Sequence, residues 1–196
     1  MKSLLLFIAS ALVFTSCAST DKLLERGDYD SLIYLTTKKL SGKKKKHVYV
    51  QALEKGFDKI TKRDMARIEE LRVSNTAEDW EDIINIANEI QHRQDLIEPF
   101  LPLVSETGYQ AKFSFVKTNK IILEAKQNSV ALYKGRLNEL VDAARKGNKR
   151  SARNAFDLID HLHLLSSDLY MPELRDEMWA LGINTIFVRI ENNSGA

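Results

Sequence analysis

Four histidines are the side chains in this sequence best suited to hold a metal ion. Two of them, His92 and His163, follow an acidic residue by three positions, a spacing that occurs in the di-iron sites of helical bundles. Such a site also needs a carboxylate from each of two further helices, and Glu124 and Glu139, the candidates of the expected long helix, lie on that one helix. On a helix, His161 and His163 would point about 200° apart, so they cannot bind one ion together. We therefore expect no metal site.

Short motifs of common enzymes are absent from the sequence. It contains no glycine-rich phosphate loop, no G-x-S-x-G nucleophile turn and no H-E-x-x-H zinc motif. We therefore expect no catalytic residues and no cofactor, and a protein that is not an enzyme.

The single cysteine, Cys17, follows an apolar run from Leu4 to Phe14 that begins just after the basic Lys2. This run is too short to cross a bilayer, which takes about 20 apolar residues, but it fits the hydrophobic region of a secretory signal. With no second cysteine in the chain, an internal disulfide is excluded. An anchoring role for Cys17 fits its position best.

The residues Thr15-Ser16-Cys17 resemble the lipobox of bacterial lipoproteins, although Phe14 stands where leucine is usual. This resemblance implies a signal peptide over residues 1–16 and a Cys17 that carries acyl chains on its sulfur. Several acyl chains hold a protein on a membrane almost permanently, because each buried methylene contributes about 0.8 kcal/mol. Ala18 lacks the acidic side chain of an inner-membrane retention signal, which favours the outer membrane. The alternative is an ordinary signal peptide with an incidental cysteine.

A run of four lysines, Lys43, Lys44, Lys45 and Lys46, is the strongest charge feature, and Lys38 and Lys39 lie one turn before it. Each lysine near an anionic surface contributes about 1 kcal/mol, so this run could contact anionic lipid, a phosphorylated glycan or an acidic partner. The alternative is a solvated helix start. Lysines are unusual at the amino end of a helix, because acidic residues are favoured there.

The overall charge is close to neutral, with Lys+Arg 29 against Asp+Glu 27. A dedicated nucleic-acid-binding protein usually has a strong basic excess, so we expect no nucleic-acid partner.

The residues Asp30-Ser31-Leu32 resemble the short O-glycosylation sequon of Bacteroidota, which makes Ser31 a candidate acceptor.

The hydrophobic spacing predicts an all-α chain, and 3 Pro with 8 Gly are too few for a barrel with many tight turns. Two segments are less clear. Residues 108–116 alternate like a strand but could be helical, and residues 184–190 have a strand pattern. Trp80, Phe156 and Trp179 are expected in the core. The expected helices cover residues 28–40, 43–60, 61–71, 76–90, 118–146, 149–165 and 172–181.

A local pattern recurs at Gly27, Glu78 and Gly147, where small or polar residues separate two expected helices. The first and third copies, GDYDSLIYLTTKKL and GNKRSARNAFDLI, resemble the second half of a tetratricopeptide (TPR) repeat. In the third copy the matching positions are Gly147, Ala152 and Phe156. The copies start 51 and 69 residues apart, which does not fit the ~34-residue TPR period. Degenerate TPR-like hairpins and a generic helical bundle therefore both remain possible.

With the lipobox, the chain resembles TPR-like outer-membrane lipoproteins of Bacteroidota over residues 17–191. The resemblance implies a lipidated tether at 17–26, stacked helical hairpins at 27–182, and a strand and tail at 183–196 that could begin a further domain. It implies a non-enzymatic module that binds a protein partner, because stacked hairpins form grooves. The periplasmic face is favoured over the cell surface. The alternative function is direct binding of envelope lipid or glycan through the basic run Lys43–His47.

Overall fold

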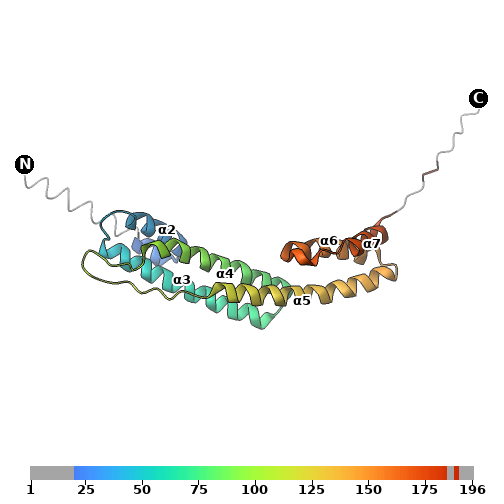
Figure 1. Ribbon diagram of the computed structural model, residues 1–196, viewed down its shortest axis with the longest axis horizontal. Coiled ribbons are helices and arrows are strands. Elements are labelled where there is room, and N and C mark those ends of the chain that lie inside the picture. The colour runs from blue at the N-terminus through green and yellow to red at the C-terminus, as the bar shows by residue number, and fades with distance from the viewer. Residues whose placement is uncertain (1–19, 185–187, 190–196) are drawn as a thin grey trace, which may run out of the picture. The chain divides into compact units, whose positions relative to one another are not determined.

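The computed structural model describes residues 20–184 and 188–189 (Figure 1). Within these residues the regular elements are helical, and the only β feature is an isolated bridge between Val104 and Gln110. The expected all-α fold of stacked antiparallel hairpins is confirmed. Residues 20–26 are also helical. The named elements are α2 (Tyr29–Leu40), α3 (His47–Ser74), α4 (Ala77–Ile97), η1 (Glu98–Phe100), α5 (Thr118–Arg145), α6 (Lys149–Leu165), η2 (Ser167–Leu169) and α7 (Pro172–Gly182).

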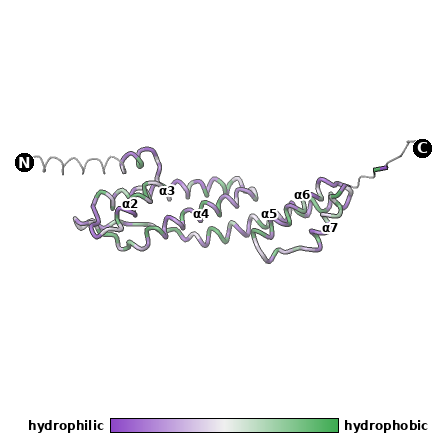
Figure 2. The backbone as a smooth tube through the Cα atoms, turned by 90° about the horizontal axis from the view of Figure 1, so that it is seen from above, coloured by the Kyte–Doolittle hydropathy of each residue, from purple (hydrophilic) through white to green (hydrophobic). Residues whose placement is uncertain are grey.

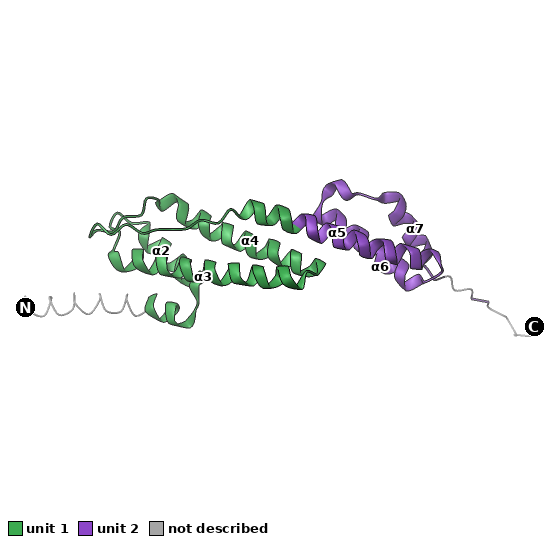
Figure 3. Cartoon of the chain, turned by 90° about the horizontal axis from the view of Figure 1, so that it is seen from below, with its two compact units in different colours: residues 1–125 green, residues 126–196 purple. Residues whose placement is uncertain are grey.

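Two compact units make up the chain (Figure 3). Unit 1 ends at Ala125 and unit 2 begins at Lys126, so the boundary lies inside α5. The length of the chain suits one domain or two small ones, and the resemblance implied one helical domain over residues 27–182. In unit 1, α2 packs on α3 and α3 packs on α4, whereas in unit 2 α6 packs on α7. The expected signal peptide, Cys17 and most of the expected strand at 184–190 lie outside the described residues.

Two hairpin turns, one in each unit, have the same hydrogen-bond pattern. Gly27 and Gly147 have left-handed φ angles of 72° and 95°, which glycine adopts without steric penalty. The Gly147 N–H donates to the Ala144 carbonyl at 2.9 Å, and the next N–H donates to the Ala143 carbonyl at 3.1 Å. Gly27 and its successor donate to carbonyls at the same spacing, so both turns are Schellman motifs. The predicted role of glycine in these turns is confirmed.

The residue after each of these glycines caps the next helix. Asp28 accepts a hydrogen bond from the Ser31 N–H at 3.2 Å, and Asn148 accepts from the N–H groups of Arg150 and Ser151, both at 3.1 Å. Such caps satisfy backbone donors that a helix start leaves unpaired. A left-handed residue followed by a cap is therefore the shared feature of these turns.

A third turn follows the same principle with different residues. Asn75 has a left-handed φ of 56°, and Thr76 begins α4 with the predicted capping box, in which Asp79 is the acidic partner. Hydrogen bonding from Thr76 lowers the pKa of Asp79 below its ordinary value of 3.8. The sequence pattern placed this copy at Glu78, which is wrong by three positions, because Glu78 lies inside α4 and the turn is at Asn75-Thr76.

Helix α3 is longer than the sequence analysis indicated. A new helix was expected to start at Thr61, but α3 continues through this residue to Ser74. No proline or glycine interrupts the chain here, and buried Ile60, Asp64 and Ile68 continue the helical spacing on one face. The expected stripe on α4 is confirmed, since Trp80, Ile83, Ala87 and Ile90 are buried and Ile84 packs partly buried beside them.

Two hydrophobic clusters pack described residues of unit 1. One joins α2 and α3 to residues after α4, and the other joins α3 and α4 to the first turns of α5. Along these helices hydrophobic and hydrophilic positions alternate in Figure 2, as expected for helices with one buried face. Helices α2 and α3 approach closely at Gly56 of α3, where an added Cβ would lie 2.7 Å from the Leu32 side chain of α2.

A buried guanidinium joins three helices of unit 1. Arg93 of α4 donates to Asp64 of α3 at 2.7 Å and to Asp30 of α2 at 2.6 Å. Glu89 lies 3.6 Å from the same guanidinium. Because Arg93 is only 5% exposed, these carboxylates compensate a charge that burial would otherwise strongly disfavour. This network fixes the positions of α2, α3 and α4 but was not foreseen from the sequence.

In unit 2, aromatic and ionic contacts hold residues 126–145 of α5 against the last two helices. The rings of Tyr133 and His161 meet edge to face with centroids 5.1 Å apart, and Arg145 pairs with Glu177 of α7 at 2.7 Å. Arg175 of α7 lies 4.1 Å from the centre of the Phe156 ring.

Only one of the three aromatic residues expected in the core is fully buried. Trp80 is 6% exposed, Phe156 is half-buried and Trp179 is 59% exposed. The prediction for Trp179 is wrong, because on α7 the neighbouring Met178 is the residue that is buried.

Candidate functional site

The segment between η1 and α5, residues 101–117, runs along the helices of unit 1 without forming a strand. We call it the strap. Tyr109, Ala111 and Phe113 pack on the cluster of α2 and α3, and Phe115 contacts Phe57. These alternate positions fit the strand-like interpretation of residues 108–116, and the helical one is wrong. Among the described residues, no strand lies beside the second half of the strap, so its extended conformation is held in another way.

The first half of the strap folds back on itself. The Ala111 N–H donates to the Leu103 carbonyl at 3.0 Å, and the Ser105 N–H donates to the Tyr109 carbonyl at 2.7 Å. Gly108 makes the turn with a φ of 85°. Leu103 and Ala111 are both buried, so this fold-back is fixed to the core of unit 1.

The second half of the strap is held by side chains of α3 and α4. Glu54 accepts hydrogen bonds from the Tyr109 hydroxyl and, at 3.0 Å, from the Lys112 N–H. The bond to Glu54 raises the pKa of Tyr109 above its ordinary value of 10.0. Gln94 accepts from the Val116 N–H at 2.5 Å and donates to the Val116 carbonyl at 3.2 Å. Helix side chains thus take the place of a neighbouring strand at both ends of residues 112–116.

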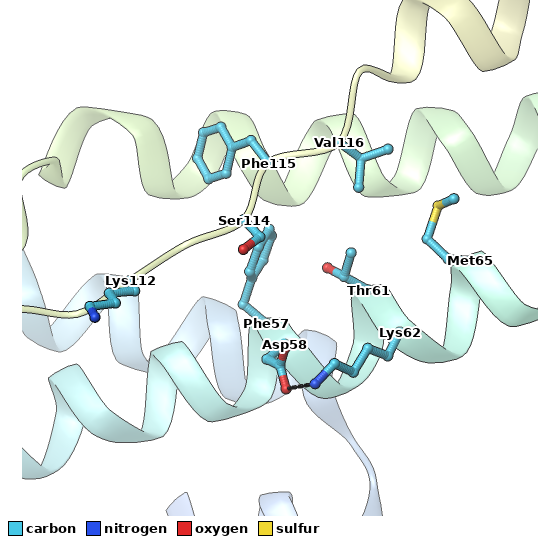
Figure 4. A pocket seen from close by; sticks show the side chains of 9 residues that line it. All are labelled: Phe57, Asp58, Thr61, Lys62, Met65, Lys112, Ser114, Phe115 and Val116. Atoms are coloured by element: carbon cyan, nitrogen blue, oxygen red, sulfur yellow. Dashed lines mark hydrogen bonds and ion pairs between the residues drawn. The ribbon is translucent and has the colours of Figure 1, made fainter.

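A groove of about 420 Å³ lies between α3 and this part of the strap. In Figure 4, Phe57, Thr61 and Met65 come from α3, whereas Ser114 and Phe115 come from the strap. The centroid of the Phe57 ring lies 5.6 Å from the centroid of the Phe113 ring and 5.8 Å from that of the Phe115 ring. The complete lining is Phe57, Asp58, Thr61, Lys62, Met65, Lys112, Ser114, Phe115 and Val116.

Backbone groups beside the groove are open. Among the described residues, the N–H groups of Phe113, Ser114 and Phe115 have no hydrogen-bond partner. Ser114 is exposed and Phe115 is 39% exposed. Open donors of an extended backbone are the groups that a second extended chain can pair with.

The rim of the groove has a small excess of positive charge. Two lysines, Lys62 and Lys112, line it together with one acidic residue, Asp58. Lys62 pairs with Asp58 at 2.8 Å, whereas Lys112 has no ionic partner within the described part of unit 1. A ligand that carries an acidic group would therefore meet an uncompensated lysine here.

The four lysines of the basic run, Lys43 to Lys46, lie in the loop between α2 and α3, and His47 begins α3. The lysines therefore precede the helix, whereas one interpretation placed them in its first turn. Lys45 has an internal role, because its ammonium group donates to the Leu40 carbonyl and lies 5.1 Å from the centre of the Phe100 ring. Lys38, Lys39, Lys43, Lys44 and Lys46 are exposed and form no ion pair with a described residue.

A hollow of about 390 Å³ adjoins this basic surface and involves Lys38 itself. Tyr34, Leu96 and Phe100 contribute apolar surface to it, and Tyr34 is 65% exposed. Exposed lysines and aromatic surface therefore occur together at the end of α2.

Ser31 is exposed in the first turn of α2, so its hydroxyl is accessible to a modifying enzyme. Its neighbour Asp30 is engaged with Arg93. O-glycosylation of Ser31 stays a prediction.

His47 and His163 make unrelated contacts. His47 lies 3.0 Å from the Thr107 hydroxyl of the strap, and His163 packs on Tyr170 with centroids 5.2 Å apart. Within residues 20–184, 188 and 189, no three side chains of the metal-binding types come together.

The chain was compared with models of protein families, with curated proteins and with solved structures, and no match was found. None of the helices in the described ranges combines the length and the hydropathy that a membrane crossing requires.

The groove was not among the sites expected from the sequence. The alternation of Tyr109, Ala111, Phe113 and Phe115 indicated an extended segment, but an extended segment alone does not indicate a groove. The groove depends on Glu54, which binds Lys112 of the strap 58 positions later in the chain, and on Gln94, which binds Val116 22 positions later.

Proposed function

We propose that this chain is a non-enzymatic, lipid-anchored helical module that binds a protein partner in the bacterial envelope, at the periplasmic face of the outer membrane. The groove between α3 and the strap carries the proposal. It is lined by apolar surface from Phe57, Met65 and Phe115 and by open backbone from the strap. A concave apolar surface with a few polar groups is the usual form of a binding site.

The lipid anchor rests on the lipobox-like Thr15-Ser16-Cys17 at the end of the apolar run. The scaffold rests on the resemblance to TPR-like lipoproteins, which the matching Schellman turns at Gly27 and Gly147 support. In this proposal the anchor keeps the groove near the membrane, where its partner is found.

Site-specific crosslinking tests the partner half of the proposal. The photoreactive residue p-benzoylphenylalanine is placed at Ser114 beside the groove or, as the control, at exposed Asn138 in unit 2. Irradiation of intact envelopes should give one stoichiometric protein adduct at position 114 and none at 138. No adduct at 114, or the same adducts at both positions, would contradict a groove-bound partner.

Mass spectrometry of the processed protein tests the anchor half. The expected amino-terminal residue is Cys17 with a diacylglyceryl group on its sulfur, and a Cys17→Ser variant should move from the membrane fraction to the aqueous fraction. A free thiol on Cys17 in the mature protein would contradict this half while leaving the groove unaffected.

A second candidate function is direct binding of an anionic envelope surface. The exposed lysines around the α2–α3 loop and the adjoining hollow with Tyr34 and Phe100 favour it. Lysine charge together with aromatic surface suits the interface of an anionic membrane.

A further inference from the structure

We propose that the groove binds an extended, acidic peptide segment whose backbone pairs with residues 113–115 of the strap, in the manner of an added β-strand. This inference rests on the proposed function and names the kind of segment that the partner presents. The open N–H groups, the apolar groove floor and the charge of the rim each support one part of it.

The backbone of the strap explains why the segment is extended. Residues 113–115 have an extended backbone, and their N–H groups have no partner among the described residues. A peptide in a helical conformation uses its own backbone groups internally, whereas an extended peptide offers carbonyls to the donors along one edge. Successive N–H groups of an extended backbone point to opposite edges, so one added strand pairs either with Phe113 and Phe115 or with Ser114. Three residues of strap span about 10 Å, so the paired part of the ligand is about three to five residues long.

The strap is also held in a way that keeps these groups available. Glu54 binds the Lys112 N–H and Gln94 binds both backbone groups of Val116, which fixes the two ends of the open stretch. Because the edge is preformed, the ligand alone loses conformational freedom on binding.

The groove floor determines the apolar part of the ligand. Phe57, Met65 and Val116 line the space beside the open backbone. In an extended chain alternate side chains point to the same side. We expect one or two apolar side chains at alternate positions of the ligand to enter the groove.

The charged residues at the rim of the groove determine the charge of the peptide ligand. Lys112 lacks an ionic partner within the described residues, and Lys62 shares its charge only with exposed Asp58. Two lysines against one aspartate attract an acidic side chain and repel a basic one. A segment with alternating apolar and acidic residues therefore complements both the floor and the rim.

Selection from a phage-displayed library of random nonapeptides tests the inference on the full chain without its signal sequence. Selected peptides are synthesised and their affinities are measured by fluorescence anisotropy. We expect acidic sequences with alternate apolar residues. Two N-methylated versions of the best peptide are compared, each methylated at alternate backbone nitrogens, in the two possible registers. One version should bind at least tenfold more weakly, because its methyl groups replace the N–H groups that donate to the strap carbonyls.

The charge requirement is tested with a double variant, Lys62→Glu with Lys112→Glu, which should weaken binding at least tenfold. The matched control, Lys59→Glu with Lys120→Glu, makes the same change of charge at exposed positions outside the groove lining and should bind as the unmodified protein does. Thermal unfolding followed by circular dichroism checks that both variants are folded.

Selected peptides that bind as helices, that carry net positive charge or that tolerate backbone methylation would overturn the inference, as would a failure to select any peptide. The crosslinking result at Ser114 is independent of these outcomes. If a stoichiometric adduct forms at position 114 but N-methylation leaves the affinity of the selected peptide unchanged, the partner site is retained and strand addition is rejected. Absence of the adduct would reject the partner site itself.

Discussion

Gln94 holds the backbone of Val116 with both ends of its side-chain amide. Its oxygen accepts the Val116 N–H at 2.5 Å, and its nitrogen donates to the Val116 carbonyl at 3.2 Å. Two antiparallel strands exchange the same pair of bonds between facing residues. A single buried glutamine on α4 therefore replaces a strand at the carboxyl end of the groove, and the strap depends on it.

Gln94→Ala removes both of these bonds and leaves the Val116 N–H without its partner. We expect the free energy of unfolding to fall by about 1–3 kcal/mol, because partly buried backbone groups lose their hydrogen bonds. Denaturant unfolding measures this loss, and hydrogen exchange of the Val116 amide should accelerate. Gln127→Ala at an exposed position of α5 is the control and should change neither quantity. Unchanged exchange at Val116 in Gln94→Ala would show that the glutamine does not hold the strap.

Two glycines inside helices should respond in opposite directions to alanine. At Gly56 a new Cβ would lie 2.7 Å from buried Leu32, whereas at Gly135 of α5 no atom lies within 4 Å of it apart from its chain neighbours and the adjacent helix backbone. We expect Gly56→Ala to destabilise the protein by about 1 kcal/mol, because the overpacking penalty exceeds the gain in helix propensity. Gly135→Ala should stabilise it by about 0.5–1 kcal/mol. Denaturant unfolding of both variants measures the pair, and two changes of the same sign would contradict the close approach of α2 and α3.

The capping box of α4 should make stability depend on pH through Asp79. Hydrogen bonding from Thr76 lowers the pKa of this carboxyl below 3.8, so the ionised form is favoured in the folded state. Its contribution is therefore present above the unfolded-state pKa and is lost as the pH falls through the lower folded-state pKa.

We expect Asp79→Asn to be less stable than the unmodified protein at pH 7. The difference between the two proteins should shrink at acidic pH, below the ordinary range of a carboxyl group. Thermal unfolding at a series of pH values measures it, with exposed Asp95→Asn as a comparison for a carboxylate outside the capping box. A difference that is constant from pH 7 to pH 3 would reject the role of the ionised carboxylate.

Charge neutralisation in the α2–α3 loop tests direct binding to an anionic surface. At about 1 kcal/mol per lysine, the triple variant Lys43→Gln, Lys44→Gln and Lys46→Gln should bind phosphatidylglycerol vesicles about 100-fold more weakly. Vesicle sedimentation of residues 18–196, over a series of salt concentrations, measures this. The control changes exposed Lys120, Lys126 and Lys146 to Gln. Equal binding of both triple variants would leave no role for the loop.

Three helix starts followed from local chemistry. The caps at Asp28, Thr76 and Asn148 act within one turn of chain, so their residue types alone indicate where a helix begins. The expected start at Thr61 was wrong because a threonine is a cap only where the preceding helix has ended, and nothing ends α3 there.

Long-range polar contacts explain what the sequence did not show. In the sequence, Asp64 is typical of an exposed helix residue. In the structure it is buried, because it accepts a hydrogen bond from Arg93, 29 positions later. The strap is similar, because Glu54 and Gln94 have no local pattern that marks them as its supports. Periodicity indicates which face of a helix is buried, but it does not indicate which polar residue on that face meets which.

The bond from Lys45 to the Leu40 carbonyl makes Lys45 chemically different from the three lysines next to it in the sequence. An amine engaged as a hydrogen-bond donor is a poor nucleophile, since it must break that bond and lose a proton before it can attack. Acylating reagents, and enzymes that modify lysine, would therefore meet three reactive amines at Lys43, Lys44 and Lys46 and one slow one between them.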